Sequence, residues 1–374
     1  MTNSNFQTQM TAPHPIPLPS GERGRSVRLD SEVRGAQLPL ISTVILNWNG
    51  KEYLRPCLQS VKEQTYPNIE IILVDNASTD GSIEYIKNVF PDLRLIINPK
   101  NMGYGAGNNR GIEGARGRYI FVLNSDTEIE KRCVEALWNC IETDHKIGVT
   151  TPKILLYDQR DIIDAAGLTI YPDGLSIGRG RLESQEKYNQ KEEVFFGSGC
   201  ASLYRREMFE EIGLFDADFF AYAEDTDLGW RARLSKWKTY YVAEAVVYHH
   251  HSKKFGTYSS MKAFLVERNR IWVAWKNFPL PMLSLWPFYT LWRYFYQGLG
   301  AVVGRGASGK FGRESSPLLL IPILIKAYLS GLRGLPEIIR KRKEVQHKKK
   351  ISNQECYRLF KKYGIKAKEI AFKE

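Results

Sequence analysis

Apolar and β-branched residues gather in short runs along the first third of the chain, and a polar loop and an amphipathic segment follow each run. The runs predict strands at residues 38–46, 69–74, 93–97 and 119–123. After the first run, apolar residues recur at helical spacing from Tyr53 to Val61, and Tyr66-Pro67 ends the helix. Strands that alternate with helices in this way predict a parallel sheet made of β-α-β units.

The pattern is irregular after Pro152, where turn signals predominate, and it becomes regular again at Val194. The irregular stretch indicates an inserted or appended region rather than further β-α-β units. Beyond it, the sequence predicts a strand within residues 194–204, helices at 206–212 and 226–237, and a strand at 239–242 that leads to His249.

Polar side chains follow the ends of the predicted parallel strands. They are Asn47, Asp75, Asn101 and the run Asn124-Ser125-Asp126. Because ligands bind beyond the carboxyl ends of such strands, we expect these residues to converge on one rim of the sheet. A carboxylate there suits Mg²⁺ or Mn²⁺, which take oxygen ligands and substrate phosphates. Taken alone, the run is as typical of a helix cap or an Asx-turn.

Three acidic residues occur within Glu224-Asp225-Thr226-Asp227, at the start of a predicted helix. The helix dipole alone favours acidic residues in a first turn. The aromatic run at 219–222 directly before them can form a partly dry wall. A carboxylate in such a place can act as a general base toward a hydroxyl group.

Two further motifs bear on the chemistry. The loop at 103–109 is rich in glycine and precedes a helix, but its glycine spacing and its place after the third strand disfavour a dinucleotide-binding site. The run His249-His250-His251 offers metal ligands, but consecutive residues of a strand point to opposite faces, so at most one or two can serve one site.

Charge and cysteine content exclude some classes of protein. Of the formal net charge of +12, about +9 lies in residues 333–374, which indicates a basic tail rather than a nucleic-acid-binding face. The five cysteines are odd in number and lack paired spacing, which disfavours a disulfide framework or a zinc site and favours a reducing compartment. Residues 1–37 are polar and lack a signal-peptide pattern, so we expect a disordered leader.

Two apolar stretches, 280–304 and 317–332, are each interrupted by a charge, at Arg293 and Lys326, so neither has the length that a spanning helix needs. We interpret them as interfacial segments at an anionic membrane surface. The aromatic residues suited to the headgroup level are Trp286, Trp292, Tyr294 and Tyr296. The alternative is that they are amphipathic helices that cover the catalytic domain.

Six motifs follow one another in a fixed order: V-I-L-N-W-N-G (44–50), V-D-N-A-S-T-D-G-S (74–82), N-M-G-Y-G-A-G-N-N-R-G (101–111), L-N-S-D (123–126), G-S-G-C-A (197–201) and G-L-F-D-A-D-F-F-A-Y-A-E-D-T-D-L (213–228). Over residues 40–255 the chain resembles glycosyltransferase family 2, in particular the bacterial branch that includes rhamnosyltransferases. The resemblance implies the GT-A fold, a single α/β domain with a mostly parallel, Rossmann-like sheet, at 38–275. Membrane-associated helices at 276–335 and a basic tail at 336–374 would follow.

The resemblance also implies roles for individual residues. The donor-binding residues would be Asn47, Asn49, Asp75, Asn101, Gly103, Asn108, Asn124 and Ser125. Asp126 matches the last position of the family's D-x-D metal motif, whose first position is Asn124 here, and His249 matches the histidine that completes a Mg²⁺ or Mn²⁺ site. Asp225 matches the catalytic base. The supporting residues would be Glu224, Asp227 and Arg231.

These roles imply an inverting, metal-dependent transfer of a sugar from a nucleotide-diphosphate donor, with dTDP-rhamnose one candidate. The acceptor would be a hydroxyl of a polyprenyl-diphosphate-linked or other saccharide. The apolar segments imply a peripheral or monotopic protein at the cytoplasmic face of the bacterial inner membrane, without nucleic-acid partners. The alternatives are a nucleotidyltransferase, which should have a basic Gly-rich loop after its first strand, and a non-enzymatic protein that binds membrane surfaces through its basic tail.

Overall fold

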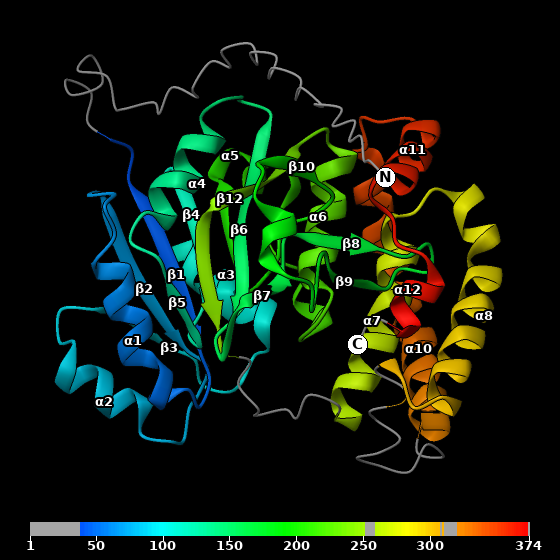
Figure 1. Ribbon diagram of the computed structural model, residues 1–374, viewed down its shortest axis with the longest axis horizontal. Helices are drawn as coiled ribbons and strands as arrows, with labels where there is room; N and C mark the ends of the chain where they lie inside the picture. Colours follow the sequence, from blue (N-terminus) through cyan, green and yellow to red (C-terminus); the bar gives the residue numbers. More distant parts are fainter. Residues whose placement is uncertain (1–37, 251–258, 307–308, 310–319, 373–374) are drawn as a thin grey trace, which may run out of the picture. The chain divides into compact units, whose positions relative to one another are not determined.

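The four strands that the apolar runs predict form the parallel half of a central sheet (Figure 1). They are β1 (Ile41–Asn47), β2 (Ile69–Asp75), β3 (Arg94–Ile97) and β4 (Tyr119–Asn124), in the spatial order β3-β2-β1-β4. Their register places Asn47 opposite Asp75, and Leu46 opposite Asn124. The strand ends therefore meet at one rim, as predicted.

The other half of the sheet is mixed. Its strands are β5 (Thr127–Ile129), β6 (Ile147–Leu156), β7 (Gln159–Ala165), β10 (Glu192–Val194), β11 (Ala201–Arg205) and β12 (Lys238–His249). β12 lies parallel to β6, whereas β11, β7, β10 and β5 are antiparallel to their partners. β6 and β7 are joined by a hairpin, which requires antiparallel pairing. The region that looked irregular thus contributes β7 and a separate two-stranded hairpin, β8 (Leu168–Ile170) with β9 (Ser176–Gly178).

Helices cover the sheet. They are α1 (Lys51–Lys62), α2 (Ser82–Val89), α3 (Tyr104–Gly114), α4 (Cys133–Ile141), α5 (Arg206–Ile212) and α6 (Glu224–Leu234). The buried residues of α1 are Leu54, Cys57, Leu58 and Val61, which are the positions at helical spacing. All five cysteines are free thiols.

The structure, a computed structural model, describes residues 38–250, 259–306, 309 and 320–372. Residues 39–374 form one compact unit. The expected leader at 1–37 lies outside the described residues, and so does His251.

The C-terminal helices gather beside the β8–β9 hairpin, away from β1 to β3 (Figure 1). They are α7 (Ser260–Asn277), α8 (Leu280–Val302), α10 (Leu320–His347), α11 (Asn353–Tyr363) and α12 (Ala367–Phe372). The boundary expected at residue 335 falls inside α10. In α11, Phe360 packs against Trp230 of α6, so the expected basic tail is part of the folded unit.

The aromatic residues of α8 divide between two environments. Trp286 donates a hydrogen bond to the carbonyl of Asp173 (2.8 Å), and the Tyr294 hydroxyl bonds to Glu267 (2.7 Å), so both face the protein rather than a headgroup layer. Trp292 is 54% exposed. No helix within the described ranges is both long and apolar enough to cross a membrane.

A buried network of charges fastens α7 and α8 to the turn between β8 and β9. Arg293 of α8 lies 2.6 Å from Asp173 of the turn and 2.9 Å from Glu267 of α7. Arg270 lies 2.6 Å from Glu267. Opposite charges therefore compensate one another out of contact with water, and the pKa of Glu267, although burial raises it, is held at about 2 by the two arginines.

Replacing Arg293 by Met should lower the free energy of unfolding by about 3–5 kcal/mol, because Asp173 and Glu267 would lose their partner in a buried site. Urea denaturation followed by circular dichroism measures this change. The matched control is Arg340→Met, which removes an exposed arginine that pairs with Glu337 and Glu344. Equal effects of the two substitutions would contradict a stabilising role for the buried network.

Candidate active site

Pairing of β5 with β12 brings Asp126 and His249 together. His249 lies opposite Thr127 in this antiparallel pair, and the backbone N–H of His250 donates to the Asp126 carbonyl (2.9 Å). The Nε2 atom of His249 is consequently 3.5 Å from Oδ1 of Asp126. Both side chains are largely buried.

Asp164 of β7 fixes the other side of the His249 ring. Its Oδ2 atom lies 2.8 Å from Nδ1 of His249, and its Oδ1 atom pairs with Arg181. Burial lowers the pKa of His249, but Cys200, Asp126 and Asp164 together raise it well above its ordinary value. The sequence analysis missed Asp164, because no motif surrounds it and only the pairing of β7 with β6 places it here.

The neighbouring His250 points away from this pair. Its ring stacks on Tyr157, with 3.5 Å between ring centroids. The two histidines thus face opposite sides of β12, as the alternation of side chains along a strand requires.

Asp225 lies in the first turn of α6 and is held by backbone donors. Its Oδ2 accepts from the N–H of Gly199 (3.0 Å), and its Oδ1 accepts from the N–H of Thr226 (2.7 Å). Burial raises the pKa of Asp225, and these hydrogen bonds oppose the rise. A Cβ atom at Gly199 would lie only 3.1 Å from Oδ2, which explains why the G-S-G motif has glycine at this close approach.

The other acidic residues of α6 differ in their surroundings. Glu224 is buried, its Oε2 has no hydrogen-bond partner among the described residues, and burial together with the charge of Asp225 raises its pKa to about 8. Asp227 instead pairs with Arg231 (2.9 Å) and Lys276 (2.9 Å). Asp227 and Arg231 therefore belong to the packing between α6 and α7, away from the cavity.

The backbone before Asp225 is strained, and a side chain of α7 holds it in place. Phe220, Tyr222 and Ala223 have left-handed φ values of 65°, 68° and 67°. Asn269 of α7 donates its side-chain amide to the carbonyls of Phe219, Ala221 and Tyr222, at 3.0, 2.8 and 2.6 Å. Such conformations persist only where surrounding contacts impose them.

The residues expected to bind the donor fall into two groups. Asn101, Gly103, Asn124 and Ser125 line the cavity described below. Asn47, Asn49, Asp75 and Asn108 do not line it. Asn47 donates to Asp75 (2.8 Å), and both side chains are buried. Asn108 is buried and donates to the carbonyl of Tyr104 (3.0 Å).

Asn76, which directly follows Asp75, was missed although it lies inside the V-D-N motif. Its amide donates to Asn101 (2.9 Å) and to the carbonyl of Gly103 (3.1 Å), and its Oδ1 accepts from Asn98 (3.0 Å). Asn76 thus fixes the chain directly before α3 and also lines the cavity. The expected glycine-rich loop at 103–109 is in fact mostly helical, because α3 begins at Tyr104. Trp48 and Tyr53, likewise missed, line the same part.

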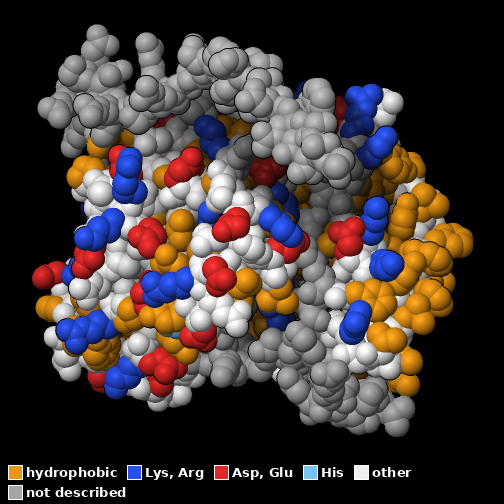
Figure 2. Space-filling view, viewed as in Figure 1, with side chains coloured by type: hydrophobic (Ala, Val, Ile, Leu, Met, Phe, Trp, Pro, Cys, Tyr) orange, Lys and Arg blue, Asp and Glu red, His pale blue; other side chains and the backbone are white. Residues whose placement is uncertain are grey.

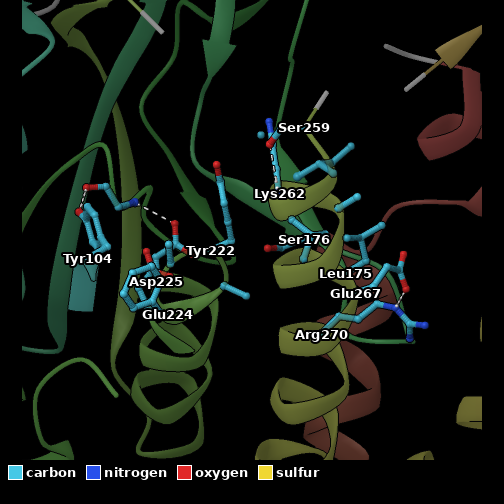
Figure 3. A pocket seen from close by; sticks show the side chains of 18 of the residues that line it. Tyr104, Leu175, Ser176, Tyr222, Glu224, Asp225, Ser259, Lys262, Glu267 and Arg270 are labelled. Carbon is cyan, nitrogen blue, oxygen red and sulfur yellow. Dashed lines mark hydrogen bonds and ion pairs between the residues drawn. The ribbon is translucent and has the colours of Figure 1, made fainter. Parts of the chain in front are cut away.

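One cavity of about 920 Å³ joins these groups. Figure 3 shows Tyr104, Tyr222, Glu224 and Asp225 on one wall and α7 on the other, with Ser176 and Leu175 of the β8–β9 hairpin beside α7. Asp126 and Asp225 both line this space. It therefore brings together Asp126, which contacts His249 behind it, the half-buried Asp225 and the start of α3.

Residues 42–213 match a family model described as glycosyl transferase family 2. The region from β1 to α5 is therefore that of a family 2 glycosyltransferase. The matched residues end before α6 and thus before Glu224, Asp225 and His249.

This glycosyltransferase is 27% identical over 273 residues to the N-acetylglucosaminyl-diphospho-decaprenol L-rhamnosyltransferase of Mycobacterium tuberculosis, an alignment that covers 62% of the chain and 86% of the relative. It is 31% identical over 182 residues to glycosyltransferase GlyG of Streptococcus pneumoniae, with 46% of the chain and 59% of the relative covered.

A solved structure of GalNAc-T7 with UDP, GalNAc and Mn²⁺ resembles the glycosyltransferase with a TM-score of 0.55 at 21% identity. The match covers 71% of the chain and 51% of GalNAc-T7, so the chain spans about half the length of that protein. This likeness supports the α/β GT-A fold that the motifs implied, with a sheet that is parallel around β1 and mixed beyond β4.

Proposed function

We propose that this glycosyltransferase moves a sugar, with inversion, from a nucleotide-diphosphate donor to a hydroxyl of a lipid-linked saccharide in bacterial cell-surface polysaccharide synthesis. The observation that carries the proposal is that Asp225 lines the same cavity as Asp126, which lies 3.5 Å from His249. A general base and a site for a cation at the leaving diphosphate are the two groups that such a displacement needs.

Asp126 and His249 fit Mg²⁺ or Mn²⁺ in chemistry and orientation. The described residues contain no cluster of three or more His, Cys, Asp or Glu side chains arranged for an ion, and two protein ligands suit cations that keep waters and bind substrate phosphates. Asp164 holds Nδ1 of His249, which leaves Nε2 directed toward Asp126. When bound, the cation would neutralise charge that develops on the departing diphosphate.

Asp225 would take the proton of the acceptor hydroxyl as its oxygen attacks the anomeric carbon. The bond to the donor diphosphate breaks on the opposite side, so one displacement inverts the anomeric centre. The N–H groups of Gly199 and Thr226 hold the carboxylate in place for this transfer. Glu224, beside it, would remain protonated near neutral pH because its pKa is about 8.

The donor would lie along Asn101, Gly103, Asn124 and Ser125, next to the backbone amides at the N-terminus of α3. Asn47, Asn49, Asp75 and Asn108 would support this rim from behind. The name of the mycobacterial relative makes rhamnose, carried by dTDP, the first donor to test.

The acceptor is proposed from the surface of the C-terminal helices. Hydrophobic side chains gather over α8 at the right-hand side of Figure 2. Exposed apolar residues of α8 and α10 include Leu280, Phe288, Leu291, Phe295, Val302, Ile321 and Leu332. A face of this kind fits a peripheral position on an anionic membrane at the cytoplasmic side, where polyprenyl-diphosphate saccharides would be within reach.

A nucleotidyltransferase remains the alternative enzyme class, but β1 is followed by Asn47-Trp48-Asn49-Gly50 rather than by a basic Gly-rich loop. Incubation with a panel of UDP-, dTDP- and GDP-sugars and a divalent cation separates the two. Release of a nucleoside diphosphate supports glycosyl transfer. A second incubation contains a nucleoside triphosphate and a sugar phosphate, and release of inorganic diphosphate there would overturn the proposal.

Replacing Asp164 by Asn should raise the concentration of Mn²⁺ needed for half-maximal activity by about 10–100-fold, because the His249 ring would lose the carboxylate that orients it. Metal titration of donor hydrolysis measures this shift. Asp161→Asn is the matched control, since Asp161 lies on the same strand but is exposed. An unchanged metal dependence in the Asp164 variant would contradict the orienting role.

A further inference from the structure

Resting on the proposed function, we infer that the part of the cavity between α7, α8, α10 and the β8–β9 hairpin binds the hydrocarbon chain of a polyprenyl-diphosphate acceptor. We name this part the apolar arm. It is lined by Ile177 of β9, Ala263 and Val266 of α7, Ala301 of α8, and Ile323 and Leu324 of α10. These residues come from three helices and a hairpin that lie beyond the donor rim of the sheet.

The first half of α10 is apolar on two faces. Ile323 and Leu324 face the cavity, whereas Ile321, Ile325 and Leu329 are 57%, 55% and 50% exposed. A helix that is hydrophobic all round normally has apolar surroundings on every side. The cavity lies on one side of this segment, and a membrane surface would cover the other, so a lipid chain could pass from the membrane into the arm.

Charged residues in the wall of the arm are compensated. Arg270 and Arg293 line the cavity but are paired with Glu267 and Asp173. The Tyr294 hydroxyl also bonds to Glu267. An ion network that is neutral and satisfied within the protein leaves the arm suited to an uncharged chain rather than to a second nucleotide.

The arm is continuous with the space that contains Asp225. Tyr222 and Glu224 lie between Asp225 and α7 in Figure 3. A saccharide at the head of a lipid in the arm would therefore lie near Asp225, the proposed base. The hydrocarbon chain of the lipid would remain away from the nucleotide.

The inference is tested by photocrosslinking with decaprenyl diphosphate that carries a benzophenone in its chain, using the full chain in detergent micelles. Cross-links in the wild-type protein should map to the arm residues of α7, α8 and α10. Unlabelled decaprenyl diphosphate should compete, and inorganic diphosphate should not. Cross-links confined to outward-facing positions such as Ile321 and Ile325 would overturn the inference, whatever any variant does.

A pair of variants sharpens this test. Leu324→Asn should lower cross-linking about tenfold, since it places a polar side chain, instead of a large apolar one, against the hydrocarbon chain of the lipid. Ile325→Asn, one residue along on the outer face, should leave it unchanged in micelles. Equal cross-linking in both variants would contradict binding of the lipid in the apolar arm.

Nucleotide-sugar hydrolysis is measured on the same samples. Absence of hydrolysis would refute the proposed function, whereas the cross-linking result tests lipid binding independently of it.

Discussion

The Asp225→Asn variant is expected to transfer sugar roughly 10²–10⁴-fold more slowly than the wild type, which is the usual contribution of a positioned general base. The amide keeps the size of the carboxylate and can still accept the hydrogen bond from Gly199, but it cannot take a proton from the acceptor. Single-turnover rates at saturating donor measure the loss. Calorimetric titration with the nucleoside diphosphate should show unchanged binding.

Glu224→Gln is the matched control for this substitution. Glu224 is the adjacent buried carboxyl group, and with a pKa of about 8 it is protonated at neutral pH, so an uncharged amide should change the rate much less. Full activity of the Asp225 variant would remove its assignment as the base. A large loss in the Glu224 variant alone would transfer the role to Glu224.

Removing the cation should have the second-largest effect. A strong chelator should abolish transfer, and Mn²⁺ or Mg²⁺ should restore it. Asp126→Asn should slow transfer by roughly 10²–10³-fold, because the cation supplies several kcal/mol of charge stabilisation at the leaving group. His249→Ala should act in the same direction, since its Nε2 faces Asp126.

His250→Ala provides the control for the histidine, because its ring stacks on Tyr157 on the other side of β12. It should keep the metal dependence of the wild type. Activity that persists in a chelator, or equal losses in the His249 and His250 variants, would refute the metal role of Asp126 and His249.

The parallel half of the fold could be predicted because a contiguous run of apolar residues marks each of its strands. Runs such as residues 119–123 are buried on both faces, and the chain must place their polar ends at one edge. The mixed half could not be predicted in this way. The strand β7 pairs with β6 through an irregular register, and this pairing alone brings Asp164 to His249.

Motifs gave the positions of the rim residues but not the directions of their side chains. Asp75 is the last residue of β2 and bonds to Asn47, whereas Asn108, expected in a loop, lies within α3 and bonds to the carbonyl of Tyr104. The packing of the basic C-terminal segment could not be predicted for a different reason. Charge composition suggested a separate tail, whereas Lys341 pairs with Asp216 and Phe360 packs on Trp230, contacts that only tertiary structure reveals.

The amide of Asn269 limits where this enzyme can be cut into separately transferable parts. Every residue with a proposed chemical role precedes α7, and the family match ends earlier still, at residue 213. The strained turn before Asp225 is nevertheless fastened by a side chain of α7. The smallest transplantable catalytic unit is therefore the sheet together with α7, and a chimera that exchanges the C-terminal helices must carry Asn269 with the donor half.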